Sequence, residues 1–326
     1  MNAIIISHIA DMDGISSAAL IMHKYGVKKE NVLFADYSVD RLLQIEKQIK
    51  EKLQKDMVLF ITDIGTNAST IKIFSRIITS IKKLGGKVFW FDHHTWSYDS
   101  IKEVASKCDL AVVGENELFC AAEITAAELK LSDPFTKKLI KMVHMSDFNI
   151  KPKDKNSAEI IKSYVLSTTY YSSFDFPTYA RRIGMIAEQM SKGVLIPNFV
   201  IADGKKFEKL NISRLKKLKE NIFVGPIASL GFSKYISTND ACACILDNTN
   251  SDIGIYLNIE NSKCHLRSKR NDCSLLAMRF GGGGHPHASG FEVNKTIYNI
   301  KTLKGKKELF SDICSVSNSL YNGSKT

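Results

Sequence analysis

Short apolar runs alternate with segments of helical periodicity along the first half of the chain. In 39–53 the apolar residues Leu42, Ile45 and Ile49 recur at helical spacing, whereas Val88 to Phe91 form one continuous run after two glycines. Such a run predicts a fully buried strand. We expect strands at 3–7, 32–37, 57–62, 88–91 and 110–113, and helices at 15–25, 39–53 and 69–84. This alternation predicts βαβ units and therefore an α/β fold with a doubly wound parallel sheet.

The pattern changes in the second half of the chain. Helices are expected at 117–131, 134–145, 158–169, 179–190 and 207–221, and strands at 241–246, 253–259 and 264–268. The glycine and proline of 193–197 interrupt the helical pattern, which favours a connection there. We therefore predict a catalytic domain over 1–191, a linker over 192–228 and a smaller α+β domain over 229–326, with Cys242 and Cys244 on one strand face.

Composition restricts the class of protein. The chain has 326 residues, of which 44% are hydrophobic and 24% charged, as in soluble globular proteins. No apolar stretch approaches the roughly 20 residues of a membrane span, so we expect no membrane partner. The chain has seven cysteines without a CxxC pair and shows no signal peptide, which favours a cytoplasmic protein. A net charge of +11 favours an anionic partner such as nucleic acid or nucleotide.

Acids and histidines follow three of the predicted strands. They are His8, Asp11 and Asp13 after the first, Asp63 after the third, and Asp92, His93 and His94 after the fourth. Carboxyl ends of parallel strands share one edge of a sheet, where ligands of α/β proteins bind. Any one of these acids alone is explained as a helix or turn cap. Together they place more negative charge in one crevice than is stable without cations.

The residue types narrow the choice of cation. Carboxylate oxygens with some imidazole, and no thiolate nearby, suit Mn²⁺ best, with Mg²⁺ or Co²⁺ as alternatives, and there are enough side chains for two ions. A further acid, Asp147, follows a helix far along the chain, and spacing alone does not place it in the site. Taken by itself, it is explained as a helix-end residue.

A run of four glycines marks the predicted second domain. The segment RFGGGGHPHASGF contains Gly282, Gly283, Gly284, His285 and His287. Consecutive glycines let backbone N–H groups approach an anion closely, and the histidines could donate to a phosphate. Arg267 and Ser268 stand at a nearby strand end, where an Arg fork would suit phosphate. Alternatively, the glycine run is a flexible loop, and Arg267 is an ordinary surface residue.

With these motifs the sequence resembles the DHH phosphoesterase family, in the branch with a C-terminal DHH-associated domain. The namesake motif is Asp92-His93-His94, the first motif is HxxDxDG from His8 to Gly14, and GGGGH with the following Ala288-Ser289-Gly290 is the C-terminal signature. Asp63 and Asp147 match the second and fourth motifs. One departure is that only two residues separate His8 from Asp11, where small-phosphodiesterase members typically have three.

The resemblance implies a role for each matching residue. One Mn²⁺ would be held by His8, Asp11 and Asp63, and a second by Asp13, Asp63, His93 and Asp147. His94 would face the scissile phosphate, and Asp92 would orient an imidazole. Arg267, Ser268, the glycines, His285 and His287 would bind the substrate's terminal phosphate or base across an interdomain cleft.

The function expected from the resemblance is a Mn²⁺-dependent phosphodiesterase. It would cleave short single-stranded RNA or DNA to mononucleotides, as a nanoRNase does. Alternatives are a pAp phosphatase or a phosphodiesterase for linear or cyclic dinucleotides, and a RecJ-like exonuclease, although no aromatic-rich basic segment for long strands is evident. A non-catalytic replication scaffold and a polyphosphate or pyrophosphate hydrolase are less favoured, and the apolar helices of 117–190 leave room for a homodimer.

Overall fold

A computed structural model describes residues 2–113 and 118–322 of the chain. The described chain divides into two compact units, 1–205 and 206–326, whose boundary falls inside helix α9 (Asn198–Lys219). Each unit has its own sheet and its own hydrophobic core. Helix α9 occupies most of the predicted linker of 192–228, in which a connecting helix over 207–221 was expected.

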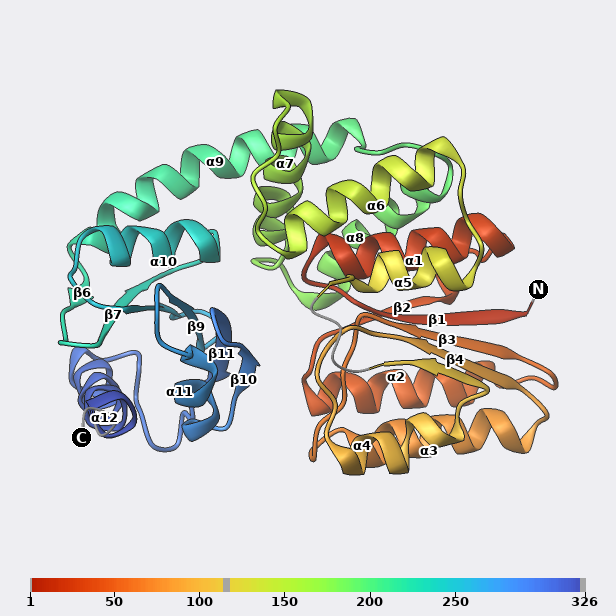
Figure 1. The fold of residues 1–326 in the computed structure, drawn as a ribbon, viewed down its shortest axis with the longest axis horizontal. Coiled ribbons are helices and arrows are strands. Elements are labelled where there is room, and N and C mark those ends of the chain that lie inside the picture. Colours follow the sequence, from red (N-terminus) through yellow and green to blue (C-terminus); the bar gives the residue numbers. More distant parts are fainter. Residues whose placement is uncertain (1, 114–117, 323–326) are drawn as a thin grey trace. The chain divides into compact units, whose positions relative to one another are not determined.

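The first unit is built on a parallel sheet of five strands in the order β2-β1-β3-β4-β5 (Figure 1). The strands are β1 (Ala3–His8), β2 (Val32–Ala35), β3 (Val58–Thr62), β4 (Lys87–Phe91) and β5 (Leu110–Val112). Every neighbouring pair is parallel. The order reverses between β1 and β3, which is the switch point at which open α/β sheets bind ligands. The predicted α/β fold class is confirmed.

Helices cover both faces of this sheet. One face carries α1 (Met12–Tyr25), α5 (Ala121–Glu128), α6 (Pro134–Asp147), α7 (Lys155–Tyr171) and α8 (Phe176–Ser191), and the other carries α2 (Val39–Lys52), α3 (Ile71–Lys83) and the short α4 (Tyr98–Glu103). Two 3₁₀ turns, η1 (Lys29–Asn31) and η2 (Ala105–Lys107), connect these elements. Ile5 packs in the core of the first face and Ile4 and Ile6 in that of the second, as the alternation of a strand requires.

The second unit is a six-stranded mixed sheet in the order β10-β11-β9-β8-β7-β6. Its strands are β6 (Ile222–Phe223), β7 (Ala228–Ser233), β8 (Ile253–Asn258), β9 (Lys263–Ser268), β10 (Gly283–His285) and β11 (Ala288–Glu292). Helices α11 (Cys273–Arg279) and α12 (Leu303–Asn322) pack with one core, and α10 (Thr238–Asp247) packs with another. The second unit is thus α+β, as expected.

The strand predicted over 241–246 is wrong, because these residues belong to helix α10. β7 and β8 are parallel neighbours, and a parallel pair needs a crossover connection, which α10 supplies. Ala241, Cys242, Ile245 and Leu246 are buried at helical spacing, while Cys244 is only partly buried, so the two cysteines do not share a face.

Several element boundaries also differ from expectation, and those of two helices differ most. The helix predicted over 117–131 covers Ala121–Glu128 in α5, and Glu117 lies outside the described residues. The connecting helix begins at Asn198, nine residues before the predicted start at Phe207. In the described part of the chain, no helix is long and apolar enough to cross a membrane.

Candidate metal centre

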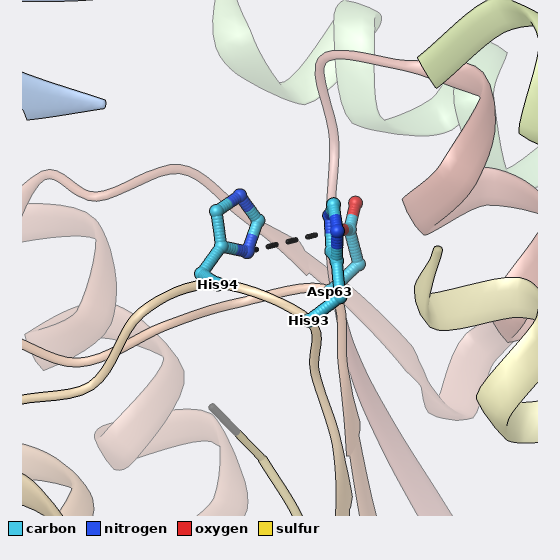
Figure 2. A group of neighbouring side chains, drawn as sticks. All are labelled: Asp63, His93 and His94. Atoms are coloured by element: carbon cyan, nitrogen blue, oxygen red, sulfur yellow. Dashed lines mark ion pairs between the residues drawn. The ribbon is translucent and has the colours of Figure 1, made fainter. Parts of the chain in front are cut away.

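The strand register brings the predicted ligands to one edge of the first sheet. Ser7 is paired with Thr62, and Thr62 with Phe91, so the residues that follow these three positions lie side by side at the carboxyl edge of the sheet. They include His8, Asp63 and the Asp92–His94 segment. Figure 2 shows Asp63, His93 and His94 gathered where their strands end.

Two local features fix this edge. Asp63 has a φ of 53°, in the left-handed region that non-glycine residues rarely occupy. Such a conformation costs free energy and persists only where the surroundings hold it, which is common at functional sites. Gly14 is required because a Cβ there would lie 2.3 Å from the carbonyl oxygen of His8. Only glycine lets α1 start so close to the end of β1.

Three side chains form a first group that could hold a metal ion: His8, Asp11 and Asp63. Nδ1 of His8 lies 2.8 Å from Oδ2 of Asp11 and 3.5 Å from Oδ2 of Asp63. Asp11 also caps α1, where its Oδ1 accepts a hydrogen bond from the Gly14 amide. The capping explanation of this acid and a ligand role are therefore compatible, because a carboxylate has two oxygens.

The second group centres on His93, which is 5% exposed. Its Nε2 is 3.6 Å from Oδ1 of Asp63, 3.7 Å from Oδ2 of Asp13 and 3.7 Å from Oδ2 of Asp147. These separations are too long for hydrogen bonds, and they leave one imidazole nitrogen at nearly equal distance from three carboxylates. The structure thus brings Asp147, the last residue of α6, beside the strand ends.

Burial and mutual repulsion both act on the carboxylates Asp13, Asp63 and Asp147. Burial raises the pKa of Asp63 well above its ordinary value, and the charges of Asp11 and Asp13 raise it further. Burial and the charge of Asp147 also raise the pKa of Asp13. Both oxygens of Asp13 accept hydrogen bonds from backbone amides at the start of α5, which lower the pKa but do not offset the rise. The pKa of Asp147 is raised to about 6, again chiefly by burial. A cation between the carboxylates would remove the repulsion.

The residues fit a divalent cation. Oδ2 of Asp63 is buried and has no hydrogen-bond partner among the described residues, and a buried carboxylate oxygen in that state is costly. Asp63 belongs both to the group with His8 and Asp11 and to one with His93 and His94. Its two oxygens therefore suit a bridge between two ions, and the oxygen and imidazole donors suit Mn²⁺ or Mg²⁺.

Asp92 fixes the second histidine of the motif. It is fully buried, and its Oδ1 lies 2.8 Å from Nδ1 of His94 while Oδ2 accepts a hydrogen bond of 2.7 Å from Nε1 of Trp96. Burial alone would lower the pKa of His94, but the charge and hydrogen bond of Asp92 raise it to about 9. The side chain of His94 is 29% exposed, so this cationic imidazole is accessible to a phosphate.

Sequence reasoning missed Tyr37, just beyond the end of β2. Its ring centroid lies 5.6 Å from that of His8 and 6.2 Å from that of His94, and its hydroxyl accepts a hydrogen bond from the Gly65 amide. Tyr37 is 40% exposed. The available signal was its place at the end of the strand predicted over 32–37, at the same edge as the acids, but a lone tyrosine carries no motif.

A second missed feature supports Asp147 from α6. His144 lies one turn before it, and its Nδ1 is 2.8 Å from Oε2 of Glu123 on α5. Glu123 in turn accepts from the Cys120 amide in a capping box. This chain of contacts ties the end of α6 to the start of α5, where Asp13 is also bound.

The remaining predicted residues lie together in the second unit. The glycine run is part of a hairpin of β10 and β11, and Arg267 on β9 is paired with Ala288 on β11. Ser268 N donates to His287 O at 3.3 Å, while the buried Oγ of Ser268 has no hydrogen-bond partner among the described residues. Nε of Arg267 donates to Asn239. His285 and His287 are exposed. That these residues bind substrate stays a prediction.

Comparison by sequence gives no relative, since no protein-family model and no curated protein matches the chain. Comparison by structure finds several solved proteins with a similar fold. An exopolyphosphatase-related protein from Bacteroides fragilis is 19% identical, with a TM-score of 0.52, and the match covers 98% of this chain and 92% of that one. A pGpG-specific phosphodiesterase, PggH, from Vibrio cholerae is 12% identical, with a TM-score of 0.54 and coverage of 97% and 99%.

A third structure is RecJ from Thermus thermophilus in complex with Mn²⁺. It is 15% identical, with a TM-score of 0.54, and the match covers 96% of this chain but only 52% of RecJ. At such identities the likeness shows the fold. The chain has the fold of the DHH phosphoesterases, so the resemblance seen in its motifs is confirmed at that level.

Proposed function

We propose that the protein is a metal-dependent phosphodiesterase that cleaves short single-stranded oligonucleotides, down to linear dinucleotides, into nucleoside monophosphates. One observation carries the proposal. Nε2 of His93 lies at nearly equal distance from carboxylates of Asp13, Asp63 and Asp147. Asp63 also belongs to the first group, with His8 and Asp11. Divalent cations held there would supply Lewis acidity for a phosphoryl oxygen and lower the pKa of a water molecule.

The residues around these two groups of ligands orient His94, His8 and Asp13. Asp92 holds the His94 ring by Nδ1, which leaves Nε2 to donate to a phosphate oxygen. Tyr37 limits the site on the β2 side, and its position against both His8 and His94 keeps these rings in place. The backbone amides at the start of α5 hold Asp13 against rotation away from His93.

The substrate class is supported by charge and by the neighbours. A net charge of +11 favours a polyanion. The neighbours PggH and RecJ are, by name, a phosphodiesterase specific for pGpG and an exonuclease crystallised with manganese. The match covers 52% of the Thermus RecJ.

The test is an assay of purified protein with Mn²⁺ and end-labelled RNA of graded lengths, beginning with dinucleotides. Equal lengths of DNA, pAp, cyclic di-AMP and polyphosphate run in parallel. Asp63→Asn is the inactive variant, because asparagine tolerates the left-handed conformation. Asp56→Asn is the matched control, since Asp56 has the same conformation, with φ of 56°, before β3 rather than after it.

The proposal predicts fast loss of dinucleotides by wild type and Asp56→Asn and no cleavage by Asp63→Asn. Processive loss of long DNA instead would establish the exonuclease alternative. Reaction of pAp or cyclic di-AMP alone would keep the metal chemistry and replace the substrate. Release of phosphate from polyphosphate alone, or cleavage of none of these compounds, would reject the proposal.

A further inference from the structure

The first unit contains a cavity of about 610 Å³ outside the metal centre. It lies at the free edge of β2, the outermost strand of the sheet, and is walled by α2 on one side and α8 on the other. Figure 1 shows these two helices on opposite faces of the sheet. None of the predicted metal ligands lines the cavity, and its volume falls within the range of small-molecule sites.

A glycine inside α8 has no structural explanation within the protein. Gly184 lies in the middle of α8 (Phe176–Ser191) and lines the cavity, and a Cβ there would meet no atom within 4 Å. Its φ is not positive and nothing crowds it. Glycine in a helix interior is unfavourable relative to alanine, and its use is often the close approach of a ligand to the backbone. The missing side chain keeps the cavity open.

A cationic side chain on the opposite wall lacks a hydrogen-bond partner at one nitrogen. Nε of Arg41 is buried and unpaired among the described residues, and the guanidinium carbon lies 3.2 Å from the ring centroid of Phe176. Nη1 of the same guanidinium donates to Oε1 of Gln44. Burial lowers the pKa of Arg41 although Asp36 is nearby, so the charge is incompletely compensated. Stacking on Phe176 holds the guanidinium in one orientation.

The remaining charges on the walls are mixed but favour an anion. Lys29 and Arg181 line the cavity beside Arg41, and Glu30 is the one acid among the lining residues. Lys29 is paired with Glu188 at 2.8 Å. The pKa of Asp175 is lowered by hydrogen bonds from Thr178 and, less strongly, by the charge of Arg181. Arg41 is therefore the group best able to bind a ligand charge.

We propose that this cavity is a second, non-catalytic binding site for a nucleoside monophosphate. Arg41 would bind the phosphate through the N–H groups of Nη1 and Nη2 that the bond to Gln44 does not use, because its Nε is buried within the protein. The base would lie against the apolar wall that includes Ile45 and Met185, with Gly184 allowing the close approach, and the unpaired backbone edge of β2 would bond its polar atoms. The site does not depend on the metal centre or on the proposed activity.

Isothermal titration calorimetry with AMP, GMP, CMP and UMP tests the site on the full chain. A chelator in the buffer prevents metal-dependent nucleotide binding at the strand edge. Gly184→Leu fills the cavity without a clash at Cβ, and Arg41→Met removes the charge while keeping contact with Phe176. Arg270→Met, at an exposed arginine paired with Asp252 in the second unit, is the matched control.

Wild type and Arg270→Met are expected to bind at least one nucleoside monophosphate, Arg41→Met about tenfold more weakly, and Gly184→Leu not detectably. Gly184→Ala should raise the melting temperature by about 2 °C, because it improves the helix, while it weakens binding. Absence of binding to wild type at millimolar nucleotide would overturn the proposal. So would binding that survives in Gly184→Leu, or inorganic phosphate binding as tightly as the nucleotide.

Discussion

The strand edge of the first unit and the glycine hairpin of the second unit were both identified from short motifs, but they differ in what fixes them. At the edge, Asp63, Asp92 and His93 are at most 5% exposed and are held by strand register and hydrogen bonds. At the hairpin, His285 and His287 are exposed. The edge is a largely buried charged cluster whose mutual repulsion a cation would remove, whereas the hairpin presents its histidines at the surface.

The glycines of the hairpin do not all have the same cause. A Cβ on Gly282 would lie 2.0 Å from the Gly290 carbonyl oxygen, and Gly284 has a φ of 131° with Ala288 O 2.7 Å from such a Cβ. Folding alone therefore requires these two glycines. Gly283 has no such crowding and no positive φ. Folding therefore does not require glycine at position 283, and close approach of a ligand to the backbone is the remaining explanation for it.

The largest effect is expected at the edge. His93→Gln removes the nitrogen that faces three carboxylates, so kcat should fall roughly 10³-fold, while KM for a dinucleotide changes little. His23→Gln, at an exposed histidine of α1 that contacts the Ser191 carbonyl, is the control. Steady-state kinetics with Mn²⁺ measures both, and equal activity of the two variants would contradict the role of His93.

Alanine variants of Gly282 and Gly283 distinguish a requirement of folding from a requirement of binding at the hairpin. Gly282→Ala should destabilise the second unit by about 2 kcal/mol, because its Cβ overlaps the backbone of β11. Gly283→Ala should change the free energy of unfolding by less than about 0.5 kcal/mol and raise KM instead. Urea unfolding and kinetics distinguish them, and a stable Gly282→Ala variant would show that the crowding is relieved by small shifts.

A smaller effect is expected from His285→Ala. If the hairpin binds a terminal phosphate, KM should rise about tenfold, the cost of one hydrogen bond to a charged group, and kcat should stay within about twofold of wild type by the same argument. A 5′-phosphorylated dinucleotide and its unphosphorylated form provide the comparison. An equal loss on both substrates, or a fall in kcat alone, would remove the hairpin from phosphate binding.

The smallest effect is the pH dependence of stability that comes from three carboxylates of the edge. Without metal, the raised pKa values of Asp13, Asp63 and Asp147, the last about 6, mean that the folded chain binds more protons than the unfolded chain. Their contribution is therefore fully present below the unfolded pKa of about 3.9 and is lost as the pH rises through the folded values. Melting temperatures in chelator should fall between pH 5 and 7, and Mn²⁺ should reduce this slope. Identical slopes with and without Mn²⁺ would contradict the repulsion.

Much of the first unit could be predicted because its pattern and its topology agree. Apolar runs such as that of Val88 to Phe91 have the length of buried strands, and the alternating helices leave a parallel sheet as the consistent arrangement. The second unit was less predictable. Ala241 to Leu246 contains small apolar residues that suit either a strand or a helix, and only the parallel pairing of β7 with β8 decides for a helix.

The site shows the same division. His8, Asp63 and Asp92 could be placed at one edge because each stands at the end of a strand of one sheet or directly after it. Asp147 could not be placed by spacing, since its position depends on how α6 packs against α1 and α5. Tyr37, Gly184 and Arg41 carry no motif, and their surroundings are set by tertiary packing.

The most direct test of the account is the number of Mn²⁺ ions bound per chain, measured by electron paramagnetic resonance titration of wild type, Asp56→Asn and Asp63→Asn. Because Asp63 belongs to both groups of ligands, wild type and Asp56→Asn should each bind two ions, and Asp63→Asn should bind both ions more weakly. Wild type that binds no Mn²⁺, or an Asp63→Asn variant that binds it as wild type does, would contradict the metal centre.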